Sequence, residues 1–258
     1  GNAERAKGFT ERTGIPAYQW DVADHAACLE GCAKVAADLG PIDVVVNNAG
    51  ITRDGTLLKM SYEAWKEVID TNLGGCFNMA KATFAGMKDR GWGRIVNIGS
   101  INGQAGQYGQ VNYAAAKSGI HGFTKALAQE GAKFGVTVNA IAPGYIDTDM
   151  VAAVPGDVLA KIVAKIPVGR LGQASEIARG VAFLCSEEGG FITGSTMSIN
   201  GGQLIALKEI AFAANGEGLH GTSIISGDTV SGTSNMRMGL CRTGMEGNLS
   251  LDYFRMVE

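Results

Sequence analysis

The sequence lacks the features that would place it in several special classes of protein. No apolar run approaches the roughly 18 residues of a membrane span, and the first residues show no apolar core of a secretion signal. Positive charge is not in excess, since the net charge is −3 and the pI is about 5.7. A basic surface for nucleic acid or an anionic membrane is therefore not expected.

Cysteine and histidine are few and scattered. The five cysteines are Cys28, Cys32, Cys76, Cys185 and Cys241. None forms a CxxC pair, so we expect neither a disulfide framework nor a metal site, and free thiols fit a reducing cytoplasm. The three histidines, which have no partner at metal-ligand spacing, are expected to be ordinary surface or packed residues: His25, His121 and His220.

What the sequence does contain is an alternation of short apolar runs with longer helical segments. The runs that predict strands are 16–24, 42–50, 93–100, 136–144 and 194–202. The segments that predict helices are 25–39, 61–91, 112–135, 156–165 and 174–187. This order predicts an α/β fold with a doubly wound, mostly parallel sheet, Rossmann-like, and helices on both faces.

Ligands of such sheets bind beyond the carboxyl ends of the strands. The segment 42–50 is a continuous apolar run, so we expect a strand buried on both faces. Four loops that follow predicted strands deserve most weight, and they come after Asp21, Asn47, Ser100 and Pro143.

The stretch "NYAAAKSG" (112–119) places Tyr113 four residues before Lys117. Residues at this spacing are neighbours on a helix. A lysine ammonium beside a phenol should lower the phenol's pKa. A tyrosine tuned in this way could exchange a proton with a carbonyl oxygen. Taken alone, Tyr113 is better explained as a half-buried aromatic residue and Lys117 as a solvated charge.

Further motifs in chain order change that balance. "NNAG" (47–50), Asn72 in "DTNLGG", Ser100 thirteen residues before Tyr113, and "PGYIDTDM" (143–150) accompany the pair. Together they resemble the short-chain dehydrogenase/reductase family over roughly residues 14–203. The resemblance implies that Ser100 binds the substrate carbonyl, that Tyr113 is the acid, and that Lys117 holds the nicotinamide ribose. It makes Asn72 the anchor of a water that relays protons. The alternative for Ser100 and Asn72 is a cap or turn role.

The same resemblance implies a set of cofactor-binding residues. Besides Tyr113 and Lys117 they are Asp21, Val22, Asn48, Ala49, Gly50, Pro143, Gly144, Ile146 and Thr148. Asp21 could instead cap the helix at 25–39. NADPH is the expected cofactor, and NADH is not excluded. No metal is implied.

Within the family the segments 50–60 and 100–130 are most similar to acetoacetyl-CoA reductases of polyhydroxyalkanoate synthesis. In those enzymes the residues that match Gln107, Gln110 and Tyr145 line the acyl pocket, together with the serine. The two glutamines could also be plain loop surface. The resemblance thus implies a cytoplasmic homotetramer that reduces a 3-oxoacyl-CoA. A 3-oxoacyl-(acyl carrier protein) reductase and a non-catalytic subunit of the same fold remain alternatives.

The two ends of the sequence depart from the family pattern. The family's first βαβ unit, with its TGxxxGxG phosphate-binding turn, is not found. We therefore expect a family domain over 1–203 and a tail of uncertain structure over 204–258. The tail contains Gly216, Gly218 and Gly221 as a GxGxxG pattern, so a circular permutation is one hypothesis. Loop glycines are the other.

Overall fold

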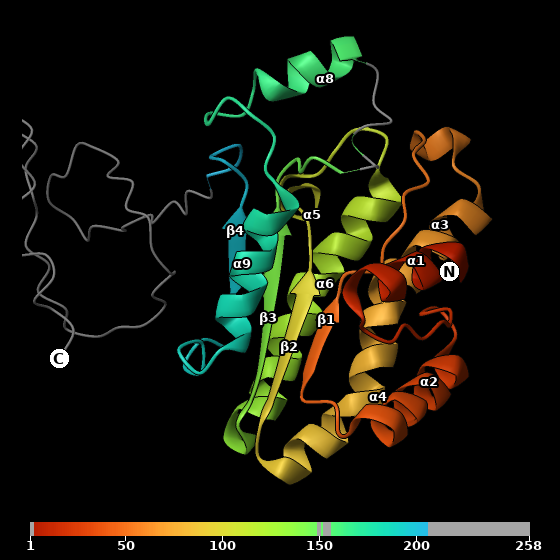
Figure 1. Cartoon of the computed structure of the whole chain (residues 1–258). Helices are drawn as coiled ribbons and strands as arrows, with labels where there is room; N and C mark the ends of the chain where they lie inside the picture. The colour runs from red at the N-terminus through yellow and green to blue at the C-terminus, as the bar shows by residue number, and fades with distance from the viewer. Residues whose placement is uncertain (1–2, 149–150, 152–155, 206–258) are drawn as a thin grey trace, which may run out of the picture. The chain divides into compact units, whose positions relative to one another are not determined.

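Short apolar segments separated by helices assemble into one sheet. The computed structural model describes residues 3–148, 151 and 156–205 (Figure 1). In these residues the strands run parallel in the order β1-β2-β3-β4. They are β1 (Val44–Asn47), β2 (Gly93–Ile98), β3 (Val136–Pro143) and β4 (Thr196–Ile199). The expected parallel α/β sheet with helices on both faces is confirmed.

Helices connect these strands and match the predicted segments closely. The α-helices are α1 (Ala3–Thr13), α2 (His25–Leu39), α3 (Tyr62–Ile69), α4 (Gly75–Arg90), α5 (Ile101–Ala105), α6 (Val111–Gly131), α8 (Gly156–Val163) and α9 (Ala174–Cys185). The shorter turns are the 3₁₀ turns η1 (Leu57–Lys59) and η3 (Ala132–Phe134) and the π-turn η2 (Asp70–Gly74). The described helices include none that is both long and apolar enough for a membrane span. Neither α1 nor the π-turn was anticipated.

Side-chain alternation divides the core between the two faces of the sheet. On β2, Ile95 packs with residues of α4 and α6, whereas Val96 and Ile98 pack on the other face against α9. Alternate residues of a strand point to opposite faces, so one strand serves both clusters. Figure 1 shows the same arrangement, with α4 and α6 on one side of the sheet and α9 on the other.

Strand β1 differs from the expectation of burial on both faces. Val45 is buried, but Val44 is 41% exposed and Val46 is 42% exposed. The reason is the position of α9, which packs on β2, β3 and β4 and does not reach β1. An apolar run therefore gave the right element but only one of its two buried faces.

The strand expected at 16–24 is wrong. Residues 14–21 have no regular structure, because no strand among the described residues pairs with them. Trp20 instead packs on α2, where its ring would lie 2.5 Å from a Cβ added to Gly31. An apolar segment needs a hydrogen-bonding neighbour to become a strand, and sequence alone does not show whether one is present.

Candidate active site

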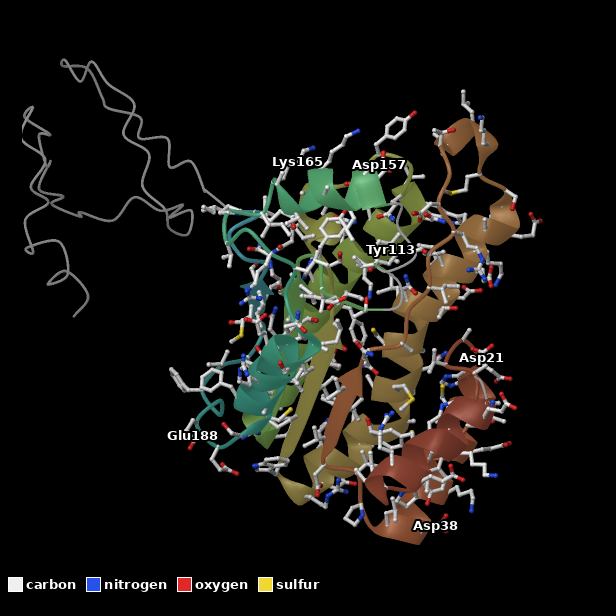
Figure 2. All side chains as sticks on the ribbon, turned by 45° about the horizontal axis from the view of Figure 1, so that its top comes forward. Asp21, Asp38, Tyr113, Asp157, Lys165 and Glu188 are labelled. Carbon is white, nitrogen blue, oxygen red and sulfur yellow. The ribbon has the colours of Figure 1, made fainter. Side chains whose placement is uncertain are left out.

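Helix α6 places Tyr113 and Lys117 on one face, as their spacing predicts. The Lys117 Nζ lies 5.6 Å from the centre of the Tyr113 ring. Lys117 is only 4% exposed, and its Nζ donates a hydrogen bond of 2.7 Å to the carbonyl of Ile98 at the end of β2. Figure 2 shows Tyr113 towards the carboxyl ends of the strands, whereas Asp38 and Glu188 lie towards the opposite end. The pair therefore stands where a parallel sheet binds ligands.

Ser100 follows β2 and joins this pair. Its Oγ accepts a hydrogen bond of 3.1 Å from the amide of Asn102, which caps α5. The same side chain acts on Tyr113, because its hydroxyl lowers the pKa of the phenol. Ser100 is thus both a helix cap and a partner of the phenol, so the two interpretations of this residue are compatible.

The pKa of Tyr113 moves in the direction opposite to the one expected from its lysine neighbour. Burial raises this pKa, and the hydrogen bond from Ser100 opposes that rise, while the charges of Asp54 and Tyr145 add to it. Burial also lowers the pKa of Lys117 to about 8. The expected lowering is wrong for this structure because burial, the largest influence on the phenol, outweighs the lowering by Ser100. The phenol consequently stays protonated at neutral pH, as a proton donor must.

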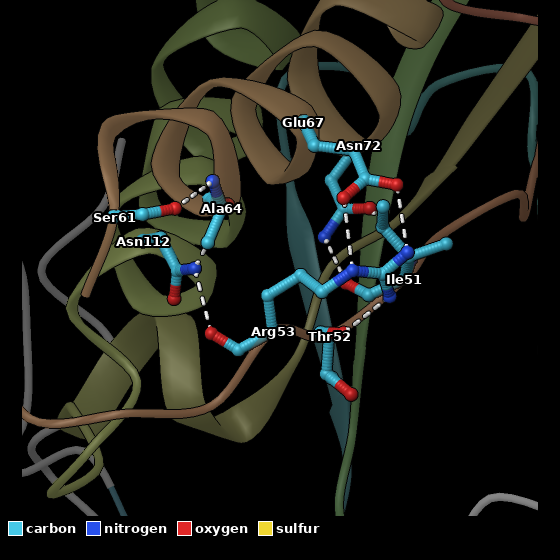
Figure 3. Close-up of polar contacts among 8 residues, drawn as sticks. All are labelled: Ile51, Thr52, Arg53, Ser61, Ala64, Glu67, Asn72 and Asn112. Atoms are coloured by element: carbon cyan, nitrogen blue, oxygen red, sulfur yellow. Dashed lines mark hydrogen bonds and ion pairs between the residues drawn. The ribbon is translucent and has the colours of Figure 1, made fainter. Parts of the chain in front are cut away.

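Asn72 lies in the π-turn η2 and binds the segment that follows β1. Its Oδ1 accepts from the Ile51 amide at 2.8 Å, and its Nδ2 donates to the Ile51 carbonyl at 3.0 Å (Figure 3). The backbone carbonyl of Asn72 accepts a hydrogen bond from the thiol of Cys76 at 3.3 Å. The side chain therefore works as a clamp on Ile51. π-turns are frequent at functional sites, but no residue in "DTNLG" predicts one from the sequence.

A second clamp holds Arg53, two residues further on. Arg53 forms two hydrogen bonds with Glu67 of α3, at 2.9 and 2.7 Å. Asn112, which directly precedes Tyr113, donates to the carbonyls of Arg53 and Ala64 at 3.0 and 3.3 Å (Figure 3). Asn112 is fully buried and was missed by sequence reasoning, although it stands inside the quoted motif. It ties the catalytic end of α6 to the 51–53 segment.

Cys76 is the other residue that sequence reasoning missed. It is buried, and burial raises the pKa of its thiol to about 11, although the charge of Lys117 opposes the rise. The thiol and Lys117 are close enough to influence each other's pKa. A scattered free cysteine gives no sequence signal for this position.

The residues predicted to line an acyl pocket lie in two places. Gln110 donates to Asp54 Oδ2 at 2.9 Å and accepts from Asn102 Nδ2 at 2.9 Å. Because Asp54 also acts on the pKa of Tyr113, this network stands beside the phenol. Gln107 is exposed on the same loop. Tyr145 lies after β3 and lines a cavity of about 100 Å³ together with residues of the 166–172 segment and β4.

The predicted cofactor residues occupy the loops after β1 and β3 and the turn before α2. A Cβ on Gly50 would stand 3.3 Å from Asn72 Oδ1 and 3.6 Å from Lys117 Nζ, so glycine keeps open the space beside the amine. Asn48 and Ala49 precede it, and Pro143 ends β3. Gly144 is required for a close approach to Asn200, whose Cα would be 2.8 Å from an added Cβ.

The remaining cofactor candidates are held by local bonds. Asp21 accepts from the Ala23 amide at 2.9 Å, and the cap of α2 is Asp24, so the alternative that Asp21 caps this helix is wrong. Val22 accepts through its carbonyl from Asn78 at 2.8 Å. Ile146 is buried and pairs with Gly172, and Thr148 donates to the Ile146 carbonyl at 3.3 Å. The glycine pattern at 216–221 lies outside the described residues, as does the permutation hypothesis.

Comparison with known proteins decides which family this geometry belongs to. A family model described as enoyl-(acyl carrier protein) reductase matches residues 1–203. The chain belongs to the short-chain dehydrogenase/reductase family. An acetoacetyl-CoA reductase of Rhizobium meliloti is 63% identical over 207 residues, which cover 80% of this chain and 86% of that protein.

Two further relatives show lower identity to this chain. An acetoacetyl-CoA reductase of Cupriavidus necator is 58% identical over 199 residues, covering 77% of this chain and 79% of that protein. The 3-oxoacyl-(acyl carrier protein) reductase of Escherichia coli is 50% identical over 182 residues, covering 70% and 75%. Together with the family match over residues 1–203, these relatives confirm the sequence resemblance stated above at the level of the family.

This family implies a nicotinamide cofactor, and the described residues fit one end of it. The open space at Gly50 borders Lys117 Nζ, a donor suited to ribose hydroxyls, and Tyr113 lies beside that amine. The fit concerns the nicotinamide riboside, which is the part that reacts.

Proposed function

We propose that this protein catalyses the NADPH-dependent reduction of acetoacetyl-CoA to the 3-hydroxyacyl-CoA. The observation that carries the proposal is the grouping of buried Ser100 and Lys117 with the half-buried Tyr113 at the carboxyl end of the sheet. The identity of 58 to 63% to two acetoacetyl-CoA reductases supports the choice of substrate. The polar network of Asp54, Gln110 and Asn102 beside the phenol supports a substrate with a second oxygen near the reacting carbonyl.

The chemistry follows from the positions of these side chains. Ser100 donates a hydrogen bond to the ketone oxygen, and Tyr113 gives its proton to the same oxygen as the carbonyl carbon is reduced. The bound nicotinamide supplies the hydride. Tyr113 enters the step protonated because its pKa is raised. The positive charge of Lys117 then stabilises the phenolate that remains, until a proton from solvent restores the phenol.

Lys117 has a second task in this proposal. With its pKa near 8, most of the amine is charged at neutral pH, and its single hydrogen bond to Ile98 leaves further N–H groups for a ribose. Asn72 binds the backbone of Ile51 and thereby fixes the position of the preceding Gly50. We propose that its backbone carbonyl, next to the Cys76 thiol, marks the route by which protons reach the lysine.

The reductase specific for carrier protein is the second candidate, supported by the 50% identity to the Escherichia coli enzyme. A carrier-protein reader needs free basic residues at the mouth of the site. Arg53 is paired twice with Glu67, so its charge is neutralised. Coenzyme A also carries phosphates that basic residues bind, so this pairing alone does not choose between the two substrates. Comparing kcat/KM for acetoacetyl-CoA and for acetoacetyl-(acyl carrier protein) decides between them.

Several finer properties belong to the same proposal. We propose NADPH over NADH, a homotetramer in the cytoplasm, and a catalytic domain that ends near residue 203, where the family match also ends. A family fold without catalysis is the alternative of another class. Gel filtration with light scattering measures the assembly.

The decisive experiment mixes the protein with NADPH and follows cofactor fluorescence, then adds acetoacetyl-CoA and follows absorbance. We expect binding and then oxidation of NADPH, with 3-hydroxybutyryl-CoA as product. No change of fluorescence favours the non-catalytic alternative. Binding without oxidation would reject acetoacetyl-CoA as substrate.

A further inference from the structure

A histidine lies one turn below the candidate site on the same helix. His121 follows Lys117 by four residues, as Lys117 follows Tyr113, so the three side chains share one face of α6. The sequence alone suggested an ordinary packed or surface residue. The contacts of its ring show that it supports the backbone that carries Ser100.

The imidazole of His121 packs against Gly99. A Cβ on Gly99 would stand 3.0 Å from the ring's Cε1 and 3.6 Å from its Nε2, so the ring takes the space of the missing side chain. The Gly99 amide donates a hydrogen bond of 2.6 Å to the Ile141 carbonyl of β3. Gly99 is thus fixed from two sides, and it directly precedes the serine of the site.

The two ring nitrogens of His121 have different surroundings. Nδ1 is 3.1 Å from the Thr196 hydroxyl on β4. Nε2 is buried and has no hydrogen-bond partner among the described residues. A neutral ring tolerates one unpaired nitrogen, whereas an added proton there would bring a buried charge without a partner.

The charged groups that act on this ring are both cations of its own helix. Burial lowers the pKa of His121 most, and Lys125 and Lys117 lower it further. From the neighbouring elements the ring meets Gly99, which follows β2, and Thr196 of β4, and neither residue carries a charge. An imidazolium would therefore be the third positive charge in a row.

We propose that His121 is a positioning residue for the reduction: its neutral ring fixes Gly99 and so aims Ser100, and its protonation disturbs both Ser100 and Lys117. The inference rests on the proposed function. Protonation would place a charge that needs solvation on the buried ring, and this would disturb its packing against Gly99. The disturbed packing would misplace Ser100, and this slows the reaction in acid. The new cation would also lower the pKa of Lys117.

The test compares kcat against pH for the wild type, His121→Asn and Lys125→Met, with NADPH and acetoacetyl-CoA. Asparagine keeps a hydrogen-bonding group for Thr196 but does not titrate and leaves Gly99 uncovered. We expect the acid limb of the profile to disappear in His121→Asn, with kcat at neutral pH lower by about tenfold and KM unchanged. In Lys125→Met the limb should move to higher pH, because one repelling cation is gone. An acid limb that stays at the same pH in both variants overturns the inference.

A second measurement does not depend on turnover. NMR of the full-length protein follows the His121 ring and the Ser100 amide over the same pH range. The inference requires that both titrate together, below the ordinary histidine value near 6.5. A Ser100 amide that ignores the titration of His121 overturns it, even if the chain proves inactive with acetoacetyl-CoA. Lack of turnover in the wild type would count against the proposed function alone.

Discussion

Two cations are buried at opposite ends of strand β2, and they are held in different ways. Arg94, near the start of the strand, is 3% exposed, and Lys117, which binds the last residue of the strand, is 4% exposed. The guanidinium of Arg94 lies 4.3 Å from the centre of the Trp92 ring and donates to two backbone carbonyls. It also approaches Glu187 to 3.9 Å.

Lys117, in contrast, has no carboxylate partner among the described residues. Among the described residues its one hydrogen bond goes to a carbonyl. The neighbouring thiol of Cys76, with a pKa of about 11, is neutral at pH 7. A buried cation without a counter-ion is unfavourable for folding, whereas one with donors to spare is suited to a ligand. From this comparison we infer that the end of β2 with fewer partners is the reactive end, and the following experiments test this inference.

Removing the phenol hydroxyl should have the largest effect. Tyr113→Phe deletes the proton donor and leaves the ring, so we expect kcat to fall by about 1,000-fold while NADPH affinity stays within a factor of about two. The measurement is steady-state turnover beside a fluorescence titration. Turnover close to wild type would show that another group supplies the proton.

Lys117→Met should separate function from stability. Burial lowers the lysine pKa from 10.5 to about 8. We therefore expect the variant to lose activity but to gain stability on the order of 2 kcal/mol at pH 7, measured by urea unfolding. A loss of stability would mean that the hydrogen bond to Ile98 outweighs the burial of the charge.

The same substitution predicts a pH dependence with a definite sign. Between pH 8 and 10.5 the unfolded chain binds the lysine proton more tightly than the folded one, so wild-type stability rises with pH in this window through this group. The stability difference between wild type and Lys117→Met should shrink there and stay constant below pH 7. Unfolding curves at several pH values measure it.

Arg94→Met is the matched experiment at the other end of the strand. Two carbonyls, of Gly93 and Gly135, lose their donor, so we expect a loss of about 1 to 2 kcal/mol. Activity should not change, because the guanidinium is remote from Ser100. If Arg94→Met were more stable than the wild type and turned over more slowly, the Arg94 end of β2 would be the reactive one.

Glu67→Gln should have the smallest effect. It weakens the pair with Arg53, whose partners are 46% and 49% exposed, so we expect at most about 0.5 kcal/mol of stability. KM for acetoacetyl-CoA should rise less than twofold, since Asn112 and Asn72 still hold the segment. A tenfold rise would give Arg53 a direct role in substrate binding.

Periodicity and motif order predicted most of the fold and the grouping of Ser100, Tyr113 and Lys117. Helices such as 25–39 were accessible because their apolar spacing is a local signal, although the cap of this helix is Asp24 and not Asp21. The exposure of the second face of β1 and the lack of a strand at 16–24 could not be predicted, because both depend on which elements pack beside these segments. The direction of the Tyr113 pKa failed for a similar reason: spacing reveals a neighbour, but not the depth of burial.

The π-turn at Asp70–Gly74 holds one residue more than a regular helix would need for the same turn. Deleting one residue there would rotate α3 by about 100° relative to α4 and swing Glu67 away from Arg53. Chain length in this short stretch thus sets the angular phase between two helices. A redesign that keeps every other side chain but changes this length by one residue would therefore disrupt the packing of the segment beneath the cofactor.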